Sequence, residues 1–66
     1  MNIRINGENR TLPGPQNLQQ LIDELALADK RLAVELNEQI VPRSRFEHTT
    51  LHDGDVVEIV HAIGGG

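Results

Sequence analysis

The sequence contains no cysteine, tryptophan or tyrosine, and its single phenylalanine is Phe46. Without cysteine the chain can form neither disulfide bonds nor thiolate metal sites, and it cannot carry sulfur on a side-chain thiol of its own. With so few aromatic residues, the hydrophobic core must be built from aliphatic side chains. Because the chain has only 66 residues, we expect one small domain with a core of modest size.

Basic residues and long apolar runs are also scarce. Six lysines and arginines stand against ten aspartates and glutamates, which gives a net charge of −4, and they form no basic stripe. Nucleic-acid binding depends on clustered positive charge, so this composition argues against it. No apolar run is long enough to span a bilayer, and the alternating N-terminus is unlike a signal peptide. We therefore expect a cytoplasmic protein that binds neither nucleic acid nor membrane.

The N-terminal part of the chain combines a hairpin pattern with a helical one. Ile3 and Ile5 alternate with polar residues, which predicts a strand with one buried face. Asn6-Gly7 predicts a tight turn because both residues tolerate positive φ, and residues 8–12 are expected to return as a second strand. The apolar spacing then changes to three and four residues behind a capping box, which predicts a helix. The residues of this pattern are the capping pair Asn17 and Gln20 and the stripe Leu18, Leu21, Ile22 and Leu25.

The middle of the chain returns to the pattern of strands. Alternation over residues 32–36 predicts a third strand. Residues 39–41 are expected to pair briefly with it before Pro42, which has no amide proton to donate to a ladder. Residues 43–52 show no clear period, although Phe46 and Leu51 within them are expected to reach the core.

The last strand is expected over residues 56–61, after a turn at residues 53–55. Its alternation points Val57 and Ile59 toward the core. The side chains expected to face outward are Val56, Glu58 and Val60.

This order of elements predicts a β-grasp fold, the ubiquitin-like α+β architecture, in which a mixed sheet of four to five strands packs against one helix. Hairpin and crossover rules place the first and last strands side by side and parallel at the sheet centre. Arg4 and Glu58 should then be neighbours on the outer face. Residues 1–61 form the domain and residues 62–66 a flexible C-terminal tail. The predicted core is Ile3, Ile5, Leu12, Leu18, Leu21, Ile22, Leu25, Val34, Leu36, Ile40, Phe46, Leu51, Val57 and Ile59.

The tail offers the carboxylate of Gly66 as a reactive group. A C-terminal carboxylate is ionised at neutral pH and is inert as an acyl donor until one oxygen becomes a good leaving group. Adenylation with ATP achieves this, and a sulfur nucleophile can then displace AMP to leave a thiocarboxylate. Gly64 and Gly65 provide access because residues without a Cβ form a thin thread, and residues 62–66 reach about 17 Å when extended. The side chains expected to dock on a partner are Val60, Ala62 and Ile63.

Terminal glycines are also typical of a frayed end or a cloning remnant. The predicted body argues against both alternatives, because its last strand leads directly into the tail and no tag-like segment is present. His48 and His52 are spaced four apart, which on a helix would place two ligands on one face, but no third ligand is evident and no metal site is expected. Asp53 and Asp55 flank Gly54 and indicate a turn rather than a cation site.

No nucleophile with a nearby base, phosphate loop or acid–base pair can be assembled from these residues. We therefore expect a protein substrate of enzymes and not an enzyme.

Three segments together resemble a known family. They are residues 36–43 (Leu-Asn-Glu-Gln-Ile-Val-Pro-Arg), residues 51–60 (Leu-His-Asp-Gly-Asp-Val-Val-Glu-Ile-Val) and residues 62–66 (Ala-Ile-Gly-Gly-Gly). In this combination, and over essentially its whole length, the chain resembles the bacterial sulfur carrier proteins of thiamine biosynthesis, which are ubiquitin-like. Members of that family often carry tryptophan where Phe46 falls, and phenylalanine fills a similar role.

The resemblance implies a reaction sequence for Gly66. An E1-like activating enzyme adenylates this glycine with ATP and Mg²⁺, a sulfurtransferase or other cysteine-derived persulfide donates sulfur to form the thiocarboxylate, and thiazole synthase takes the sulfur into the thiazole ring. The carrier itself holds no cofactor. Two alternatives stay open at this point. One is the small subunit of molybdopterin synthase or another ubiquitin-like sulfur carrier, and the other is a ubiquitin-like module that binds partners without covalent chemistry.

Overall fold

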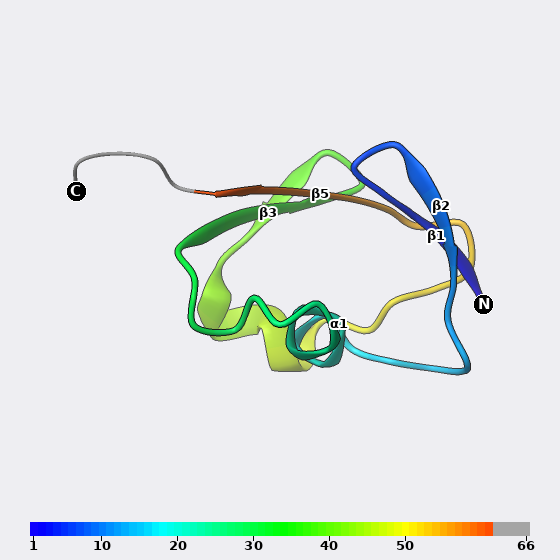
Figure 1. The fold of residues 1–66 in the computed structure, drawn as a ribbon, viewed down its shortest axis with the longest axis horizontal. Coiled ribbons are helices and arrows are strands. Elements are labelled where there is room, and N and C mark those ends of the chain that lie inside the picture. Colours follow the sequence, from blue (N-terminus) through cyan, green and yellow to red (C-terminus); the bar gives the residue numbers. More distant parts are fainter. Residues whose placement is uncertain (62–66) are drawn as a thin grey trace.

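The computed structural model describes residues 1–61 of the chain. Five strands form one sheet in the order β2-β1-β5-β3-β4. A helix and a 3₁₀ segment cover one face of this sheet (Figure 1). The elements in chain order are β1 (Asn2–Ile5), β2 (Glu8–Thr11), α1 (Leu18–Glu24), β3 (Leu32–Leu36), β4 (Gln39–Val41), the 3₁₀ segment η1 (Arg43–His48) and β5 (Val56–His61).

The strand that comes last in the chain lies at the centre of the sheet. β5 runs parallel to β1 and antiparallel to β3, while β1 with β2 and β3 with β4 form antiparallel hairpins. This is the β-grasp arrangement that the order of the sequence patterns predicts. A parallel central pair needs a crossover between its strands, and the chain from β2 to β4 supplies it. No helix among residues 1–61 has the length and apolar character required to cross a membrane.

The helix begins where its capping residues predict. The Asn17 side chain accepts a hydrogen bond from the Gln20 N–H at 2.8 Å, and the Gln20 side chain accepts one from the Asn17 N–H at 2.8 Å. These two bonds satisfy amide groups that have no partner within the helix. Leu18, Leu21 and Ile22 consequently face the sheet and are fully buried.

The core is aliphatic apart from Phe46, as the composition requires. Two of the predicted core residues, Leu25 and Leu36, are only half-buried and pack against its edge. The buried side chains, all of them predicted, are Ile3, Ile5, Leu12, Leu18, Leu21, Ile22, Val34, Phe46, Leu51, Val57 and Ile59.

One core prediction is wrong: the Ile40 side chain is 75% exposed. In the register of the β3–β4 hairpin Ile40 lies opposite Glu35, whereas Val41 lies opposite the buried Val34. Because successive side chains of a strand point to opposite faces, Val41 takes the inward position and Ile40 faces outward. The strand is only three residues long, and Ile40 and Val41 are both apolar, so its sequence alternation alone does not fix its orientation.

The segment without a clear period is held by Phe46 and Arg43. It forms η1, and the Phe46 ring is buried between this segment and α1. Arg43 donates hydrogen bonds to the carbonyl oxygens of Ala28, at 2.8 Å, and Lys30, and its guanidinium lies 5.8 Å from the centre of the Phe46 ring. Arg43 therefore fastens the loop after α1 to η1.

Arg4 and Glu58 lie on adjacent strands, as predicted, but they are not directly opposite each other. Arg4 lies opposite Val56 in the β1–β5 register, and Glu58 lies opposite Glu35 in the β3–β5 register. Both Arg4 and Glu58 are exposed on the outer face, as their strand positions predict. Glu58 lies two residues beyond the direct partner of Arg4 along β5, so the two side chains share a face and are diagonal to each other.

Candidate functional site

β5 is the element that leads to the residues of the predicted reactive tail. Its Val57 and Ile59 side chains are buried, and its pairing with β3 continues to its last residue, with Val60 opposite Ala33 and His61 opposite Leu32. In Figure 1 the end of β5 lies on the side of the molecule away from the N-terminus. The core and the central position in the sheet thus fix the point at which the chain reaches residue 62.

Asn6 holds the C-terminal part of β5 from the β1 side. Its backbone has a φ of 50° as the chain turns toward β2, and its N–H still donates to the Val57 carbonyl at 2.9 Å. Its side chain also bonds to Ile59 twice: Oδ1 accepts from the Ile59 N–H at 2.8 Å, and Nδ2 donates to the Ile59 carbonyl at 3.2 Å. From the sequence, Asn6 is predicted only as a turn residue, and no local pattern indicates this contact.

Asn37 holds the beginning of β5 from the β3 side. It also has a φ of 50° in a hairpin turn, and its N–H donates to the Val56 carbonyl at 2.8 Å. Its Oδ1 accepts from the Val56 N–H at 3.0 Å, and its Nδ2 donates to a carboxylate oxygen of Asp55 at 3.1 Å. Two turn asparagines therefore fix β5, one near each end of the strand.

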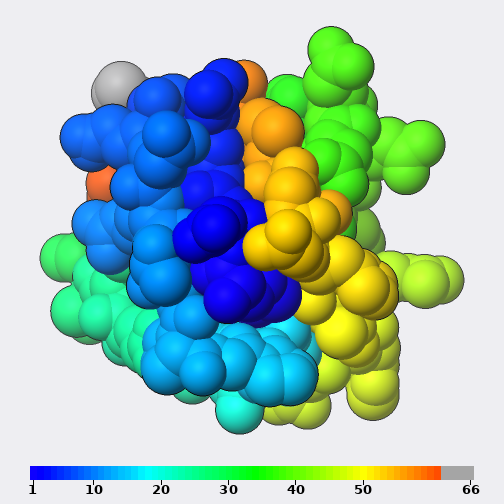
Figure 2. All heavy atoms as spheres, turned by 90° about the vertical axis from the view of Figure 1, so that its right-hand side faces the viewer, coloured from blue at the N-terminus to red at the C-terminus, as the bar shows by residue number. Residues whose placement is uncertain are grey.

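The turn that precedes β5 accounts for both of its aspartates. Asp53 accepts a hydrogen bond from the Asn2 N–H at 2.6 Å, and Asp55 accepts one from the His52 N–H at 2.8 Å. Gly54 between them has a φ of +88°. Figure 2 looks at this end of the molecule, where the blue N-terminal residues lie against the yellow and orange segment that enters β5. The turn interpretation of Asp53 and Asp55 is confirmed.

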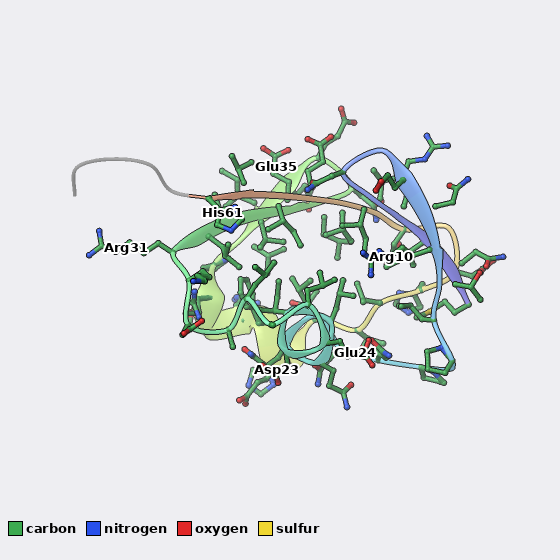
Figure 3. The ribbon with its side chains drawn as sticks, viewed as in Figure 1. Arg10, Asp23, Glu24, Arg31, Glu35 and His61 are labelled. Atoms are coloured by element: carbon green, nitrogen blue, oxygen red, sulfur yellow. The ribbon has the colours of Figure 1, made fainter. Side chains whose placement is uncertain are left out.

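The sheet face turned away from α1, which we call the outer face, combines apolar and acidic side chains. Val60, a predicted docking residue, is 57% exposed there and lies opposite the exposed Ala33. Figure 3 shows Glu35 pointing away from α1 on the same face. The other side chains on the outer face of β3, β4 and β5 include Val56, Glu58, Glu35 and Ile40.

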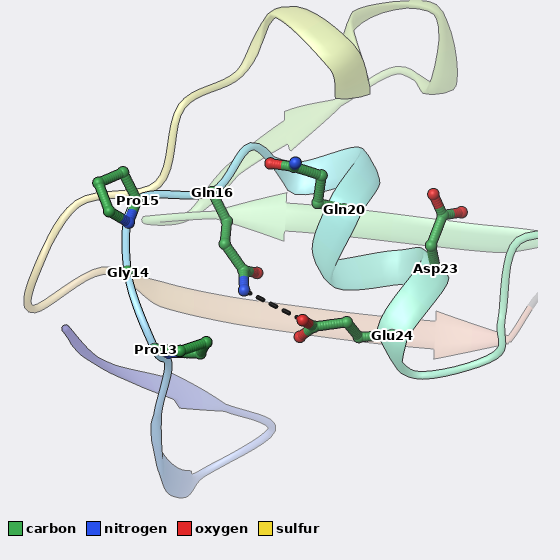
Figure 4. Close-up of a pocket in the computed structure, with 7 residues that line it drawn as sticks. All are labelled: Pro13, Gly14, Pro15, Gln16, Gln20, Asp23 and Glu24. Carbon is green, nitrogen blue, oxygen red and sulfur yellow. Dashed lines mark hydrogen bonds between the residues drawn. The ribbon is translucent and has the colours of Figure 1, made fainter.

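A hollow on the other side of the molecule is a poor candidate for a nucleotide site. It measures about 520 Å³ between α1 and the loop that precedes it (Figure 4). Asp23 and Glu24 contribute to its lining, and the Gln16 Nε2 donates to the Glu24 carboxylate at 3.2 Å. Carboxylates at such a surface repel the phosphates of a nucleotide, and no lysine or arginine lines the hollow to offset them.

Histidine and carboxylate side chains form no metal-binding group of three or more within residues 1–61. His48 belongs to η1 and His52 follows the buried Leu51, and both histidines are exposed. The predicted tail residues Gly64, Gly65 and Gly66, together with the docking residues Ala62 and Ile63, lie outside the described residues. The structure thus describes the base from which the tail starts, which consists of β5, the Asn6 contact and the outer face.

Comparison with known proteins identifies the family. The sequence model of the ThiS family matches residues 3–66. A thiazole synthase of Paramagnetospirillum magneticum is 41% identical over the whole chain, which spans only 20% of that protein. The sulfur carrier protein ThiS of Thermus thermophilus is 39% identical, with 94% of this chain and 95% of that protein aligned. The crystal structure of a thiamine biosynthesis protein (ThiS) from Geobacter metallireducens has a TM-score of 0.87 at 38% identity, with both chains fully covered.

These matches include both the β-grasp body and the residues of the glycine tail. The chain therefore belongs to the ThiS family, the sulfur carriers of thiamine biosynthesis to which its sequence motifs pointed.

Proposed function

We propose that this protein carries sulfur for the thiazole moiety of thiamine as a thiocarboxylate on Gly66. The observation that supports the proposal most is the combination of family membership with a central strand that leads directly to Gly64-Gly65-Gly66 in a chain without cysteine. Because no thiol is available on the carrier, the sulfur atom must be attached to another group. The C-terminal carboxylate is the group that activation chemistry can convert.

The reaction begins with the attack of a Gly66 carboxylate oxygen on the α-phosphorus of ATP. An acyl-adenylate forms and pyrophosphate leaves, with Mg²⁺ offsetting the phosphate charge in the activating enzyme. The terminal sulfur of a persulfide then attacks the acyl carbon and AMP departs with the electron pair of the broken bond. A second thiol, from the activating enzyme or the sulfurtransferase, cleaves the resulting acyl disulfide. The products are the thiocarboxylate and a disulfide.

The partners follow from this sequence of steps. An E1-like enzyme performs the adenylation and a sulfurtransferase supplies the persulfide, while the carrier acts as a co-substrate and holds no cofactor. Thiazole synthase is the proposed acceptor of the sulfur, because a thiazole synthase contains a segment similar to the whole of this chain. Since the activation consumes ATP, we place the protein in the cytoplasm.

We propose that the outer face near the tail docks on these enzymes, through Val60 together with Ala62 and Ile63. The exposure of Val60 beside Ala33 supports this assignment, since adjoining apolar side chains on a protein surface mark sites of interaction with other proteins. Val60→Ser should weaken binding to thiazole synthase in calorimetry. Val56→Ser, on the same face but at the far end of β5, is the matched control and should bind nearly as the unmodified protein does.

Intact-mass measurement tests the central claim. After incubation with the activating enzyme, ATP, Mg²⁺ and a persulfide donor, a species heavier by the difference between a sulfur and an oxygen atom should appear. A chain without Gly65 and Gly66 should stay folded and acquire no sulfur. If the full chain gains no mass under conditions that convert a known carrier, the thiocarboxylate proposal is wrong. Growth of a deletion strain that is restored by added thiazole would assign the pathway.

A further inference from the structure

Asn6 has a role in the sheet that its place in a hairpin turn does not require. The β1 main chain pairs with β5 at Arg4 and Ile5, and at Asn6 the backbone turns toward β2. The Asn6 side-chain amide nevertheless exchanges two hydrogen bonds with the Ile59 backbone, at 2.8 and 3.2 Å. A primary amide offers the donor and the acceptor of a peptide group. The Asn6 side chain therefore substitutes for one further residue of β1.

The Asn6 contact marks the last point at which β5 is held on both sides. Beyond Ile59, Val60 and His61 pair with β3 alone within residues 1–61. A strand bonded along both edges resists twisting about its own axis, whereas a strand bonded along one edge can twist and swing away from its former neighbour. Gly66 lies five residues beyond His61, so a small rotation at this base produces a larger displacement at the end of the tail.

We propose that Asn6 is a positioning residue for the reacting terminus, because its bonds to Ile59 set the direction in which the chain leaves the sheet. The inference rests on the proposed function, in which an enzyme must receive the tail in its active site. Asn6 holds Ile59 in place before an enzyme binds, so that less conformational freedom of the strand end is lost on binding.

Asparagine is the side chain that meets all the requirements of this position. Aspartate accepts from the Ile59 N–H but cannot donate to the Ile59 carbonyl, and glycine offers neither group. Serine and threonine have shorter side chains with a single hydroxyl. Asparagine is also the non-glycine residue that best tolerates the positive φ of 50° found here.

Asn37, in the turn between β3 and β4, provides a matched control that contacts the same strand. It has the same φ of 50° in the same kind of turn, and its side chain likewise makes two hydrogen bonds, to Val56 and Asp55. These contacts hold β5 at the end far from the tail. Asn6→Gly and Asn37→Gly each remove two side-chain hydrogen bonds without backbone strain, because glycine adopts positive φ freely.

The test compares the two variants as substrates of the activating enzyme in pyrophosphate release. We expect Asn6→Gly to raise the KM for the carrier about tenfold with kcat unchanged, because pre-ordering is lost before binding while the threaded tail reacts normally. Asn37→Gly should keep the KM of the unmodified protein, although its thermal stability should fall by about as much as that of Asn6→Gly. Asn6→Asp, which retains the acceptor, should have an intermediate KM.

Amide hydrogen exchange supplies a readout that is independent of catalysis. Exchange at Ile59 should accelerate in Asn6→Gly and not in Asn37→Gly, and the NMR resonances of residues 62–66 should shift in Asn6→Gly alone. A KM that is unchanged in Asn6→Gly, or raised equally in both variants, overturns the positioning role while the proposed function stands. If the unmodified chain is never adenylated, the proposed function fails, and the tail resonances alone then decide whether Asn6 orients the tail.

Discussion

Glu35 and Glu58 lie directly opposite each other on the outer face, where β3 pairs with β5. Like charges in this arrangement are destabilising, because directly opposite side chains on one face of a sheet lie close together and the two carboxylates repel each other. We expect Glu58→Gln to raise the free energy of unfolding by about 0.2–1 kcal/mol at low ionic strength. Urea denaturation measures this change. The gain should shrink as added salt screens the repulsion between the two side chains.

The control for the charge itself is Glu47→Gln. Glu47 belongs to η1, on the opposite side of the sheet, and its side chain is exposed. The substitution removes the same negative charge and should change the free energy of unfolding by less than about 0.5 kcal/mol. A Glu58→Gln protein that is less stable than the unmodified one would contradict the pairing of Glu58 with Glu35.

The orientation of β4 predicts unequal effects of the same substitution in two strands. Ile3 is 3% exposed and Ile40 is 75% exposed. Ile3→Ala should lower the free energy of unfolding by about 2–5 kcal/mol, because it removes buried methyl groups and leaves a cavity. Ile40→Ala should lower it by less than about 0.5 kcal/mol. A large loss of stability in Ile40→Ala, measured by thermal or urea denaturation, would mean that β4 presents its other face to the core.

The backbone conformation of Gly54 should make it sensitive to substitution. Gly54 has a φ of +88°, whereas Gly14 shows no positive φ, and a Cβ added at either position meets open space. Gly54→Ala should therefore lower the free energy of unfolding by about 1–2 kcal/mol through backbone strain alone. Gly14→Ala should leave stability unchanged or raise it slightly, because it restricts the unfolded chain. Equal effects of the two substitutions in calorimetry would refute the role of backbone conformation.

The capping box of α1 predicts a loss of stability in Asn17→Ala. The helix has only seven residues, so it depends on its cap and on packing against the core rather than on intrinsic propensity. Removal of the Asn17 side chain should lower the free energy of unfolding by about 1 kcal/mol. Gln19→Ala is the control, because Gln19 bonds only to the exposed Asp23 side chain. The helical circular dichroism signal during urea denaturation monitors both variants, and a Gln19→Ala loss as large as that of Asn17→Ala would argue against the cap.

The predictions from sequence succeeded where a local pattern is compatible with only one structure. Alternation in β1 and β5 identified the buried faces of these strands, and the capping residues Asn17 and Gln20 located the start of α1. The glycine tail and the motifs of residues 36–43 and 51–60 led to the family that the comparisons show.

Failures occurred where the outcome depends on which residues pair in the folded sheet, which the local pattern does not determine. The pattern of the three residues of β4 is compatible with either orientation, and only the pairing of Ile40 with Glu35 settles which face is buried. The Asn6 contact with Ile59 joins residues 53 positions apart in the sequence, so no local pattern predicts it. The signal available in the sequence is an asparagine in a hairpin turn next to a central strand, because its side-chain amide can bond to the backbone of that strand.

The central place of β5 also has a consequence for synthesis of the protein. β5 follows all other elements in the chain, yet it separates β1 from β3 and supplies the buried Val57 and Ile59. Until β5 has left the ribosome, the two hairpins have no common neighbour and the core stays open. A chain that terminates prematurely before or within this strand therefore offers no folded surface to an enzyme. Because the fold requires β5, a folded chain is one whose translation has reached the residues shortly before the glycines on which the proposed chemistry depends.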